Sequence, residues 1–355
     1  VLVVGDFTAE ALRRAGVRTP IHIVPTPTPD DYFDVPLWQA DQQVRLACPA
    51  YVFPNADVPA RERWDAPDPV GQGDFVAAAW PGRLARSLGR MWQEQGERLS
   101  PPLLAQGVRW VASRLQTDRW QAYLRGCRRD AVELSGVVYT SIVKPGDIRA
   151  NWQDLLTGFV SALGDREDAT LVIQFEPCEQ AMVEQIFDFY RGVGLSHRCK
   201  IVFITQSVAL DQMLTLVRAS AYYLTTTRAD GNCLPLMNYL AAGRPGIAAC
   251  HSAIGDYFAE DVGLTIPWQP EPAPWPHDSR ARLKTTWARL DWADLVERLR
   301  ESYALASHDH PAYAARAARA RQRLREWASA ESVWPRLAAA LEDLDAIRGR
   351  QGCAA

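Results

Sequence analysis

Two short polar segments each follow a hydrophobic, strand-like run, and their residue types suit the binding of anions. The first follows residues 137–143 and reads Lys144-Pro-Gly-Asp-Ile-Arg149. Its two cations stand just ahead of a segment that favours a helix, and the positive end of a helix adds to their attraction for negative charge. Because ammonium and guanidinium groups are frequent partners of phosphate, this segment predicts a diphosphate site.

The second segment is the loop Asp230–Asn238, which follows the apolar run 221–224. Pro235 suits the first turn of a helix, because its φ is fixed near the helical value. The amide groups of Gly231–Leu234 are therefore expected at a helix start, where amide hydrogens have no partner within the helix. A loop of this kind binds anions or polyols.

The elements that must position these segments alternate between strands and helices. Continuously apolar strands that are separated by helices form parallel sheets covered on both faces. The expected strands are 137–143, 171–175, 201–204, 221–224, 246–249 and 264–266. We therefore predict an α/β fold with a Rossmann-like parallel sheet over residues 137–270 and helices on both of its faces. Both polar segments are then expected at the carboxyl edge of this sheet.

Three further segments flank the predicted sheet domain. Residues 1–30 contain a strand, a helix and a second strand, which cannot bury a core alone and are expected to be the end of an amino-terminal α/β domain. Residues 31–136 are predicted to be an irregular and helical insertion, with apolar residues at helical spacing between Leu84 and Leu115. A Pro- and Trp-rich connector over residues 269–277 leads into the carboxyl-terminal segment 271–355. Its stretches 312–327 and 333–347 are rich in Ala, Arg and Leu, which predicts helices.

The insertion carries a basic stretch with interspersed tryptophans between Arg83 and Arg129. One interpretation is a peripheral contact with an anionic membrane surface. The interpretation we favour is a helical hairpin that packs on its own protein, because an apolar stripe beside exposed arginines is usual for such helices. No apolar run is long enough to span a bilayer. The chain is expected in the cytoplasm, and peripheral attachment to the inner face of the membrane is the alternative.

Composition excludes several classes of protein. The chain has 355 residues, 48% of them hydrophobic, and a formal net charge of -3, which gives no argument for nucleic acid as a partner. Its seven cysteines form no C-x-x-C pair, and this pattern fits a reducing compartment. Neither a G-x-G-x-x-G nor a P-loop motif follows a strand. His308 and His310 lack further ligands nearby in sequence, so no metal site is predicted, and His251 is expected to be a capping histidine rather than a base.

The second polar segment carries a resemblance to a known family. Asp230-Gly-Asn-Cys-Leu-Pro-Leu-Met-Asn238, followed by Ala242-Gly-Arg-Pro-Gly-Ile-Ala, resembles the region E-G-x-x-L-P-x-x-E-A-x-A-x-G-x-P of retaining glycosyltransferases with the two-Rossmann GT-B architecture, glycosyl transferases group 1 or family 4-like. Residues 137–159 resemble that family's strand, R-K-N segment and helix, and residues 200–224 its base-binding strand and the elements after it. Residues 5–33 are similar to the piece that joins the two domains of such enzymes.

The resemblance implies a hexosyltransferase of polysaccharide biosynthesis. It would transfer a hexose from a UDP- or GDP-linked sugar with retention, without a metal or other cofactor, to a glycan, lipid-linked or protein acceptor. Asp230 would approach the transferred sugar. The implied donor-binding residues are Lys144 and Arg149 at the diphosphate, Thr205 and Gln206 near the base, Asn238 at the ribose, and the amides of Gly231, Asn232, Cys233 and Leu234 at the sugar or phosphate.

Three positions depart from the family's pattern. Asp230 and Asn238 stand where the motif has its two glutamates, and Ala150 stands where the R-K-N segment has its lysine. An amide accepts hydrogen bonds less strongly than a carboxylate, so weaker donor binding is predicted. The family's acceptor domain is not recognisable ahead of the donor domain, so the chain is expected to be incomplete as an enzyme. The alternative is a non-catalytic GT-B-like nucleotide-sugar-binding or scaffold protein with a degenerate donor site.

Overall fold

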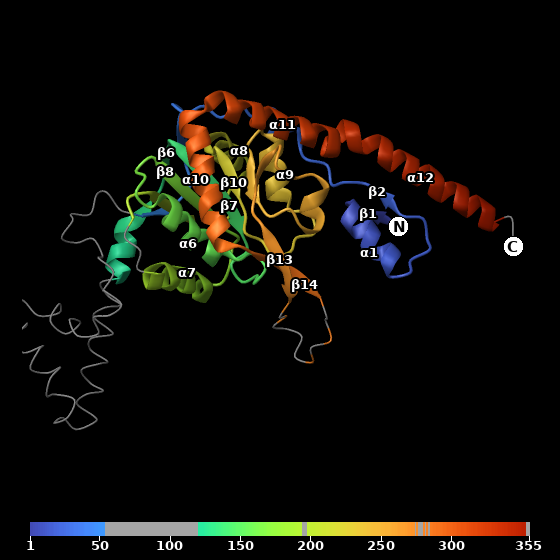
Figure 1. Cartoon of the computed structure of the whole chain (residues 1–355), viewed down its shortest axis with the longest axis horizontal. Coiled ribbons are helices and arrows are strands. Elements are labelled where there is room, and N and C mark those ends of the chain that lie inside the picture. Colours follow the sequence, from blue (N-terminus) through green and yellow to red (C-terminus); the bar gives the residue numbers. More distant parts are fainter. Residues whose placement is uncertain are drawn as a thin grey trace, which may run out of the picture.

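The structure, a computed structural model, describes residues 1–53, 120–193, 197–273 and 285–352, together with residues 275, 280 and 282. Its centre is an eight-stranded sheet with the order β12-β11-β10-β7-β8-β9-β4-β5 (Figure 1). Six of these strands are mutually parallel, namely β7 (Val137–Val143), β8 (Ala169–Phe175), β9 (Lys200–Ile204), β10 (Tyr222–Leu224), β11 (Gly246–Ala248) and β12 (Gly263–Thr265). The predicted Rossmann-like α/β fold is therefore confirmed.

Side chains of the central strands alternate between two cores on opposite faces of the sheet. Val137 and Tyr139 of β7 belong to one hydrophobic cluster, and Val138 belongs to another. The alternation follows from the two-residue period of a strand, and each core then needs a layer of helices to exclude water. The first face is covered by α6 (Trp152–Leu163), α7 (Gln180–Val193) and α10 (Trp292–His308); the second by α8 (Leu210–Ala219) and α9 (Leu234–Ala241).

The helices after the sheet continue this packing. α11 (His310–Ala328) lies against α9, and α12 (Ala330–Gly352) extends from it as a long helix (Figure 1). The helices predicted over 312–327 and 333–347 are thus confirmed. A short 3₁₀ helix, η3 (Ser252–Asp256), lies between β11 and β12. Within the part of the chain that the structure describes, no helix is long and apolar enough to cross a bilayer.

The described parts of residues 31–136 differ from the predicted irregular insertion. β4 (Ala50–Phe53) pairs antiparallel with β9, and β5 (Arg128–Arg129) pairs with β4, so both extend the central sheet. β3 (Gln43–Leu46) and β6 (Val132–Ser135) form a separate antiparallel pair over α8. The prediction was wrong here because a four-residue strand with only two buried side chains, such as Val44 and Leu46 in β3, is too short to show a period.

The helices expected between Leu84 and Leu115 lie outside the described residues, and so does most of the basic stretch. Its described end, residues 120–127, is helical and buries Trp120, Leu124 and Cys127 in the core beside α7. The guanidinium of Arg191 lies over the Trp120 ring, 5.8 Å from its centre. This end therefore packs on its own protein, as the favoured interpretation expects.

The first thirty residues form a small unit beside the carboxyl-terminal helix (Figure 1). β1 (Leu2–Val3) and β2 (His22–Ile23) are parallel, with α1 (Asp6–Arg14) between them. The amide of Phe7 donates to Asp256 Oδ1 in η3 at 3.3 Å, and His22 Nε2 lies 3.4 Å from Asp343 of α12. The chain then enters the main domain through α2 (Asp30–Phe33), which packs on α9.

A hairpin follows the last parallel strand. β13 (Trp268–Pro272) pairs antiparallel with β14 (Thr286–Leu290), and the pair projects from the body of the domain (Figure 1). The sequence predicted only a Pro- and Trp-rich connector here, because two prolines in β13 argue against a central strand. They are compatible with a two-stranded ribbon, where each strand has a free edge.

Candidate functional site

The strand order creates a switch point between β7 and β10. From β7 the chain proceeds outward through β8 and β9, and from β10 it proceeds in the opposite direction through β11 and β12. The loops that leave the carboxyl ends of β7 and β10 therefore diverge, and ligands of open α/β sheets bind in the crevice between such loops. These loops are the two polar segments singled out in the sequence, and the fold brings them to one place.

Hydrogen bonds join the two loops directly. The amide of Arg228 donates to the carbonyl of Arg149 at 2.8 Å. Thr226 Oγ1 donates to the carbonyl of Asn151 at 2.8 Å, and Arg228 Nη2 donates to Asn151 Oδ1 at 3.2 Å. Asn151 has a positive φ of 50° and forms the N-cap of α6. The start of α6 and the loop after β10 are consequently held as one unit.

Arg149 is bound by a carboxylate of its own loop. Its Nε lies 3.0 Å from Asp147 Oδ1 and its Nη2 2.5 Å from Asp147 Oδ2. This pairing lowers the pKa of Asp147 and raises the pKa of Arg149, to which the charge of Asp230 adds a smaller contribution. The Arg149 side chain remains 41% exposed, and Lys144 is exposed as well. Both predicted cations thus lie at the carboxyl edge, with Asp147 and Asp230 as counter-charges.

Asp230 organises the loop that it begins. Its Oδ1 accepts the amide hydrogen of Asn232 at 2.9 Å and that of Cys233 at 2.6 Å. Two of the four amides that the sequence left free are therefore bonded within the loop, because a short aspartate side chain readily reaches amides two and three residues ahead. Gly231 and Leu234 supply the other two amides of this loop, and both residues are exposed.

Buried side chains hold the turn that leads into α9. Cys233 is its N-cap, with a positive φ of 48°, and its side chain is buried. Burial raises the pKa of the Cys233 thiol, so the group is neutral and serves packing rather than nucleophilic chemistry. Tyr257 donates its hydroxyl to the carbonyl of Asn232 at 2.8 Å. The loop is consequently supported by the core and presents its other side outward.

Asn238 contacts a residue that the sequence did not single out. Its side chain lies close to the hydroxyl of Tyr32 in α2. Burial raises the pKa of Tyr32, and the neighbouring Asn238 amide partly offsets the rise. The position expected at the ribose therefore lies against the segment that enters the domain.

His251, in the loop after β11, holds the neighbouring loop in place. Its Nε2 donates to the carbonyl of Thr227 at 2.7 Å, and its Nδ1 lies 3.1 Å from Ser252 Oγ. Burial lowers the pKa of His251, while the bond to Thr227 and the charge of Asp230 oppose this shift. Since both ring nitrogens are engaged, His251 is a satisfied histidine, as the sequence predicts.

Thr205 and Gln206 follow β9 and lie farther along the same edge. Neighbouring strands are about 4.8 Å apart, so the end of β9 is about 10 Å from the end of β7, two strands away. Gln206 Nε2 lies 3.7 Å from the sulfur of Cys48, in the turn between β3 and β4. The fold thus places these residues on the edge that carries the polar loops but does not bring them into contact with Arg149 or Asp230.

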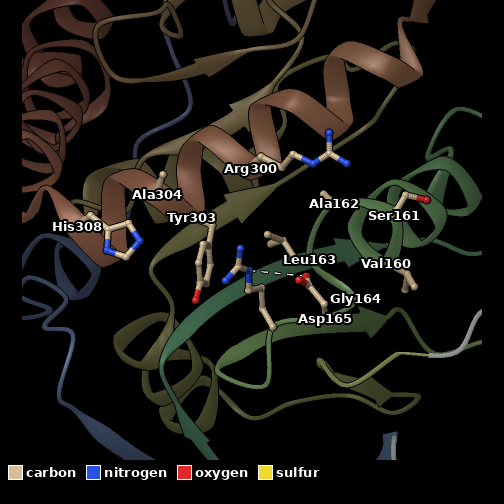
Figure 2. A pocket seen from close by; sticks show the side chains of 11 residues that line it. Val160, Ser161, Ala162, Leu163, Gly164, Asp165, Arg300, Tyr303, Ala304 and His308 are labelled. Atoms are coloured by element: carbon tan, nitrogen blue, oxygen red, sulfur yellow. Dashed lines mark ion pairs between the residues drawn. The ribbon is translucent and has the colours of Figure 1, made fainter.

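A cavity of about 560 Å³ lies elsewhere, between the ends of α6 and α10 (Figure 2). Its lining includes Arg166, Arg300, Tyr303 and His308. α6 runs back from the carboxyl edge, so its last residues and this cavity are at the amino edge of the sheet. The Arg166 guanidinium is paired with Asp165 at 3.7 Å, and the cavity contains none of the predicted site residues.

No cluster of three or more metal-binding side chains occurs among the described residues. At the carboxyl edge, Arg149 and Arg228 each pair with a carboxylate. Arg228, which sequence reasoning missed, lies between the two loops and the hairpin, with its Nη1 3.7 Å from Glu271. Its partners are far away in the sequence, and no local motif could have indicated them.

Comparison with solved structures finds this fold in glycosyltransferases. Sucrose-phosphate synthase from Thermosynechococcus elongatus matches with a TM-score of 0.51 and 12% identity over 98% of this chain and 58% of that chain. A glycosyltransferase from Rickettsia africae matches with a TM-score of 0.52 and 8% identity over 97% of this chain and 62% of that one. The chain therefore spans less than two thirds of either protein's length.

No protein-family model and no curated protein matches the sequence. The structural likeness defines the class: the chain has the GT-B type of fold, which the motif around Asp230 had indicated. The predicted resemblance is thus confirmed at the level of the fold.

Proposed function

We propose that this chain binds a nucleotide sugar in the crevice between the loops after β7 and β10 and transfers its hexose to an acceptor. The observation that supports this proposal most is the meeting of two loops at the switch point, where Arg228 bonds to Arg149 and Asn151. The cationic loop and the Asp230 loop are far apart in sequence, yet the sheet places them side by side. A diphosphate and its attached sugar would fit one loop each.

For this reaction the crevice must stabilise the leaving group. Departure of a nucleoside diphosphate develops negative charge, and fixed donors aimed at that charge lower the barrier without a metal. In this proposal Lys144 and Arg149 contact the diphosphate, and the amides of Gly231 and Leu234 face the phosphate or sugar. Arg149 is already oriented by Asp147, so little conformational freedom is lost when a phosphate arrives.

Asp230 would face the transferred hexose. Because its Oδ1 holds two loop amides, the carboxylate has a fixed orientation, with Oδ2 as the atom that would meet a sugar hydroxyl. The base of a UDP- or GDP-linked donor would lie toward Thr205 and Gln206, and the ribose toward Asn238. In the same proposal, the transfer retains the configuration of the sugar and needs no metal. The chain then acts in polysaccharide biosynthesis and lies in the cytoplasm.

A second candidate function is nucleotide-sugar binding or scaffolding without catalysis. It is favoured by the engagement of Asn238 with Tyr32 and by the pairing of Arg149 with Asp147. In that case the loops hold each other rather than a donor, and the chain would contribute its surface to a larger assembly.

Calorimetric titration with UDP-glucose, UDP-N-acetylglucosamine and GDP-mannose tests the proposal. Saturable heat with at least one of them, and slow release of free UDP or GDP from that donor, is the expected result. Binding without release would favour the non-catalytic alternative. No heat with any nucleotide or nucleotide sugar would refute both forms of donor binding.

A further inference from the structure

The hairpin β13–β14 is fastened to the crevice through Arg228. The amide of Ala288 in β14 donates to the carbonyl of Arg228 at 2.7 Å. The Arg228 guanidinium lies over the ring of Trp287, 5.0 Å from its centre, and Trp287 Nε1 donates to Glu271 Oε1 at 2.6 Å. Backbone, ion-pair and ring contacts therefore hold the paired strands of the hairpin against the loop that leads to Asp230.

At the start of this hairpin, Trp268 is held in place yet remains 39% exposed. Its Nε1 donates to the carbonyl of Cys250 at 2.9 Å, which satisfies the polar edge of the indole. Its ring meets the His251 ring edge to face, with centres 5.7 Å apart and planes at 74°. His251 in turn donates to the carbonyl of Thr227 at 2.7 Å, so the indole lies beside the loop that leads to Asp230.

A fixed, exposed indole next to polar groups suits one kind of ligand. Indole faces are apolar and electron-rich, and they stack on the C–H faces of sugar rings, whose hydroxyls then bond to polar groups around the edge. Because the polar N–H of Trp268 is already bonded, it offers its ring and not a hydrogen bond.

We propose that Trp268 is a stacking platform for a sugar ring, and that the hairpin β13–β14 forms one wall of the crevice. This inference rests on the proposed function, because the crevice identifies the ring as a sugar. The ring comes from one of two sources, the hexose of the donor or the terminal sugar of the acceptor. Both present the same C–H face to the indole, and the two arms of the experiment separate them.

The variants are Trp268→Ala, Trp268→Phe and the control Trp334→Ala. Trp334 is 66% exposed on α12, away from the crevice, so its substitution removes an exposed indole without touching the platform. Phe keeps an aromatic face, and its retention of binding would separate stacking from mere space filling.

The donor arm measures dissociation constants of UDP-glucose, GDP-mannose, UDP and GDP by calorimetry. If the ring is the donor's, Trp268→Ala weakens the binding of the nucleotide sugars about five-fold, because the sugar no longer stacks on an aromatic ring, and leaves UDP and GDP unchanged. Trp268→Phe keeps most of the affinity, and Trp334→Ala keeps all of it.

The acceptor arm records saturation-transfer spectra of methyl α-glucoside, methyl α-mannoside and methyl β-galactoside, with and without UDP or GDP. If the ring is the acceptor's, the wild-type chain gives a signal that Trp268→Ala loses and both other variants retain. The inference is overturned if Trp268→Ala equals the wild type in both arms. Failure of the proposed function looks different, because wild-type protein would then bind no nucleotide while the glycoside spectra still report on Trp268.

Discussion

Asp147 and Arg149, two residues apart in the loop after β7, form an ion pair with three side-chain hydrogen bonds of 2.5 to 3.1 Å, and the Arg149 amide adds a fourth bond to Asp147 Oδ1 at 3.0 Å. The pair orients the guanidinium at the mouth of the crevice. It also neutralises the charge that a diphosphate would meet, so the two effects oppose each other.

Substitution Asp147→Asn separates these effects. An amide at position 147 can still accept the Arg149 backbone amide, but it no longer competes with phosphate for the guanidinium charge. We expect the dissociation constant of UDP or GDP, measured by calorimetry, to fall about five-fold, which is about 1 kcal/mol. Asp165→Asn, which alters a similar neighbouring pair at the opposite edge, should leave the constant unchanged. Weaker binding of UDP or GDP to Asp147→Asn would mean that the orientation of Arg149 matters more than its free charge.

Substitution Asn238→Glu tests the ribose position. A carboxylate accepts a ribose hydroxyl more strongly than an amide does, so donor affinity should rise by about 1 kcal/mol. The Tyr32 hydroxyl can donate to the new carboxylate, which keeps the side chain oriented. Tyr32→Phe, which removes that hydroxyl in the wild-type background, serves as the control for orientation alone. Unchanged or reduced affinity in Asn238→Glu would place the ribose elsewhere.

Arg244 is fully buried and has no carboxylate partner among the described residues. It donates to the carbonyls of Pro36, Val217 and Ala242 at 2.6 to 3.0 Å, and burial lowers its pKa to about 10. Arg244→Met would remove these bonds and leave the Pro36 carbonyl without its donor, so the free energy of unfolding in urea should fall by about 3 kcal/mol.

The surface substitution Arg319→Met serves as the control for Arg244→Met, because Arg319 donates to one exposed carbonyl at 3.1 Å. It should change the free energy of unfolding by less than about 0.5 kcal/mol. Equal effects of the two substitutions would show that Arg244 does not hold the segment around Pro36 against the domain.

The buried His251 and the half-buried His197 predict a loss of stability in mild acid. Burial lowers the pKa of His197 and of His251 below the ordinary value of 6.5, so at lower pH the unfolded chain binds more protons than the folded one. The free energy of unfolding should therefore be greatest above pH 6.5 and fall as pH drops through that value toward the lower folded-state pKa values.

Urea unfolding at a series of pH values measures this effect. The double variant His197→Asn and His251→Asn should be less stable at neutral pH, because it lacks the hydrogen bonds of the two imidazoles, but its stability should depend less on pH in this window. If the free energy of unfolding changed with pH equally in the wild type and in the double variant, other groups would cause the pH dependence.

Much of the site could be predicted from the sequence because the strands that precede its loops are easily recognised. β7 is buried at all but one of its seven positions, and Lys144 and Arg149 follow it in the chain, so their place at the carboxyl edge follows from the parallel topology. Asp230 is similarly placed by β10 and by the proline at the start of α9. Local signals therefore identified both loops and the edge on which they meet.

The partners of these residues could not be predicted in the same way. The Tyr32 contact to Asn238 and the Glu271 contact to Arg228 join segments that are distant in the chain, and their side chains show no period or motif. β3 and β4 escaped prediction because four residues carry too few alternations. The bonding of Asp230 to its own loop amides was within reach, since aspartate before glycine favours such turns.

The position of the nucleotide site is tested most directly by calorimetry of UDP and GDP binding to two double variants, Lys144→Met with Arg149→Met, and Arg166→Met with Arg300→Met. Each variant removes two cations, one pair from the carboxyl-edge crevice and the other from the amino-edge cavity of Figure 2. We expect the crevice variant to bind at least about ten-fold more weakly, because charge-assisted bonds to the diphosphate are removed, and the cavity variant to bind like the wild type. Weakened binding in the cavity variant, with the crevice variant unaffected, would contradict the assignment of the donor site to the loops of Arg149 and Asp230.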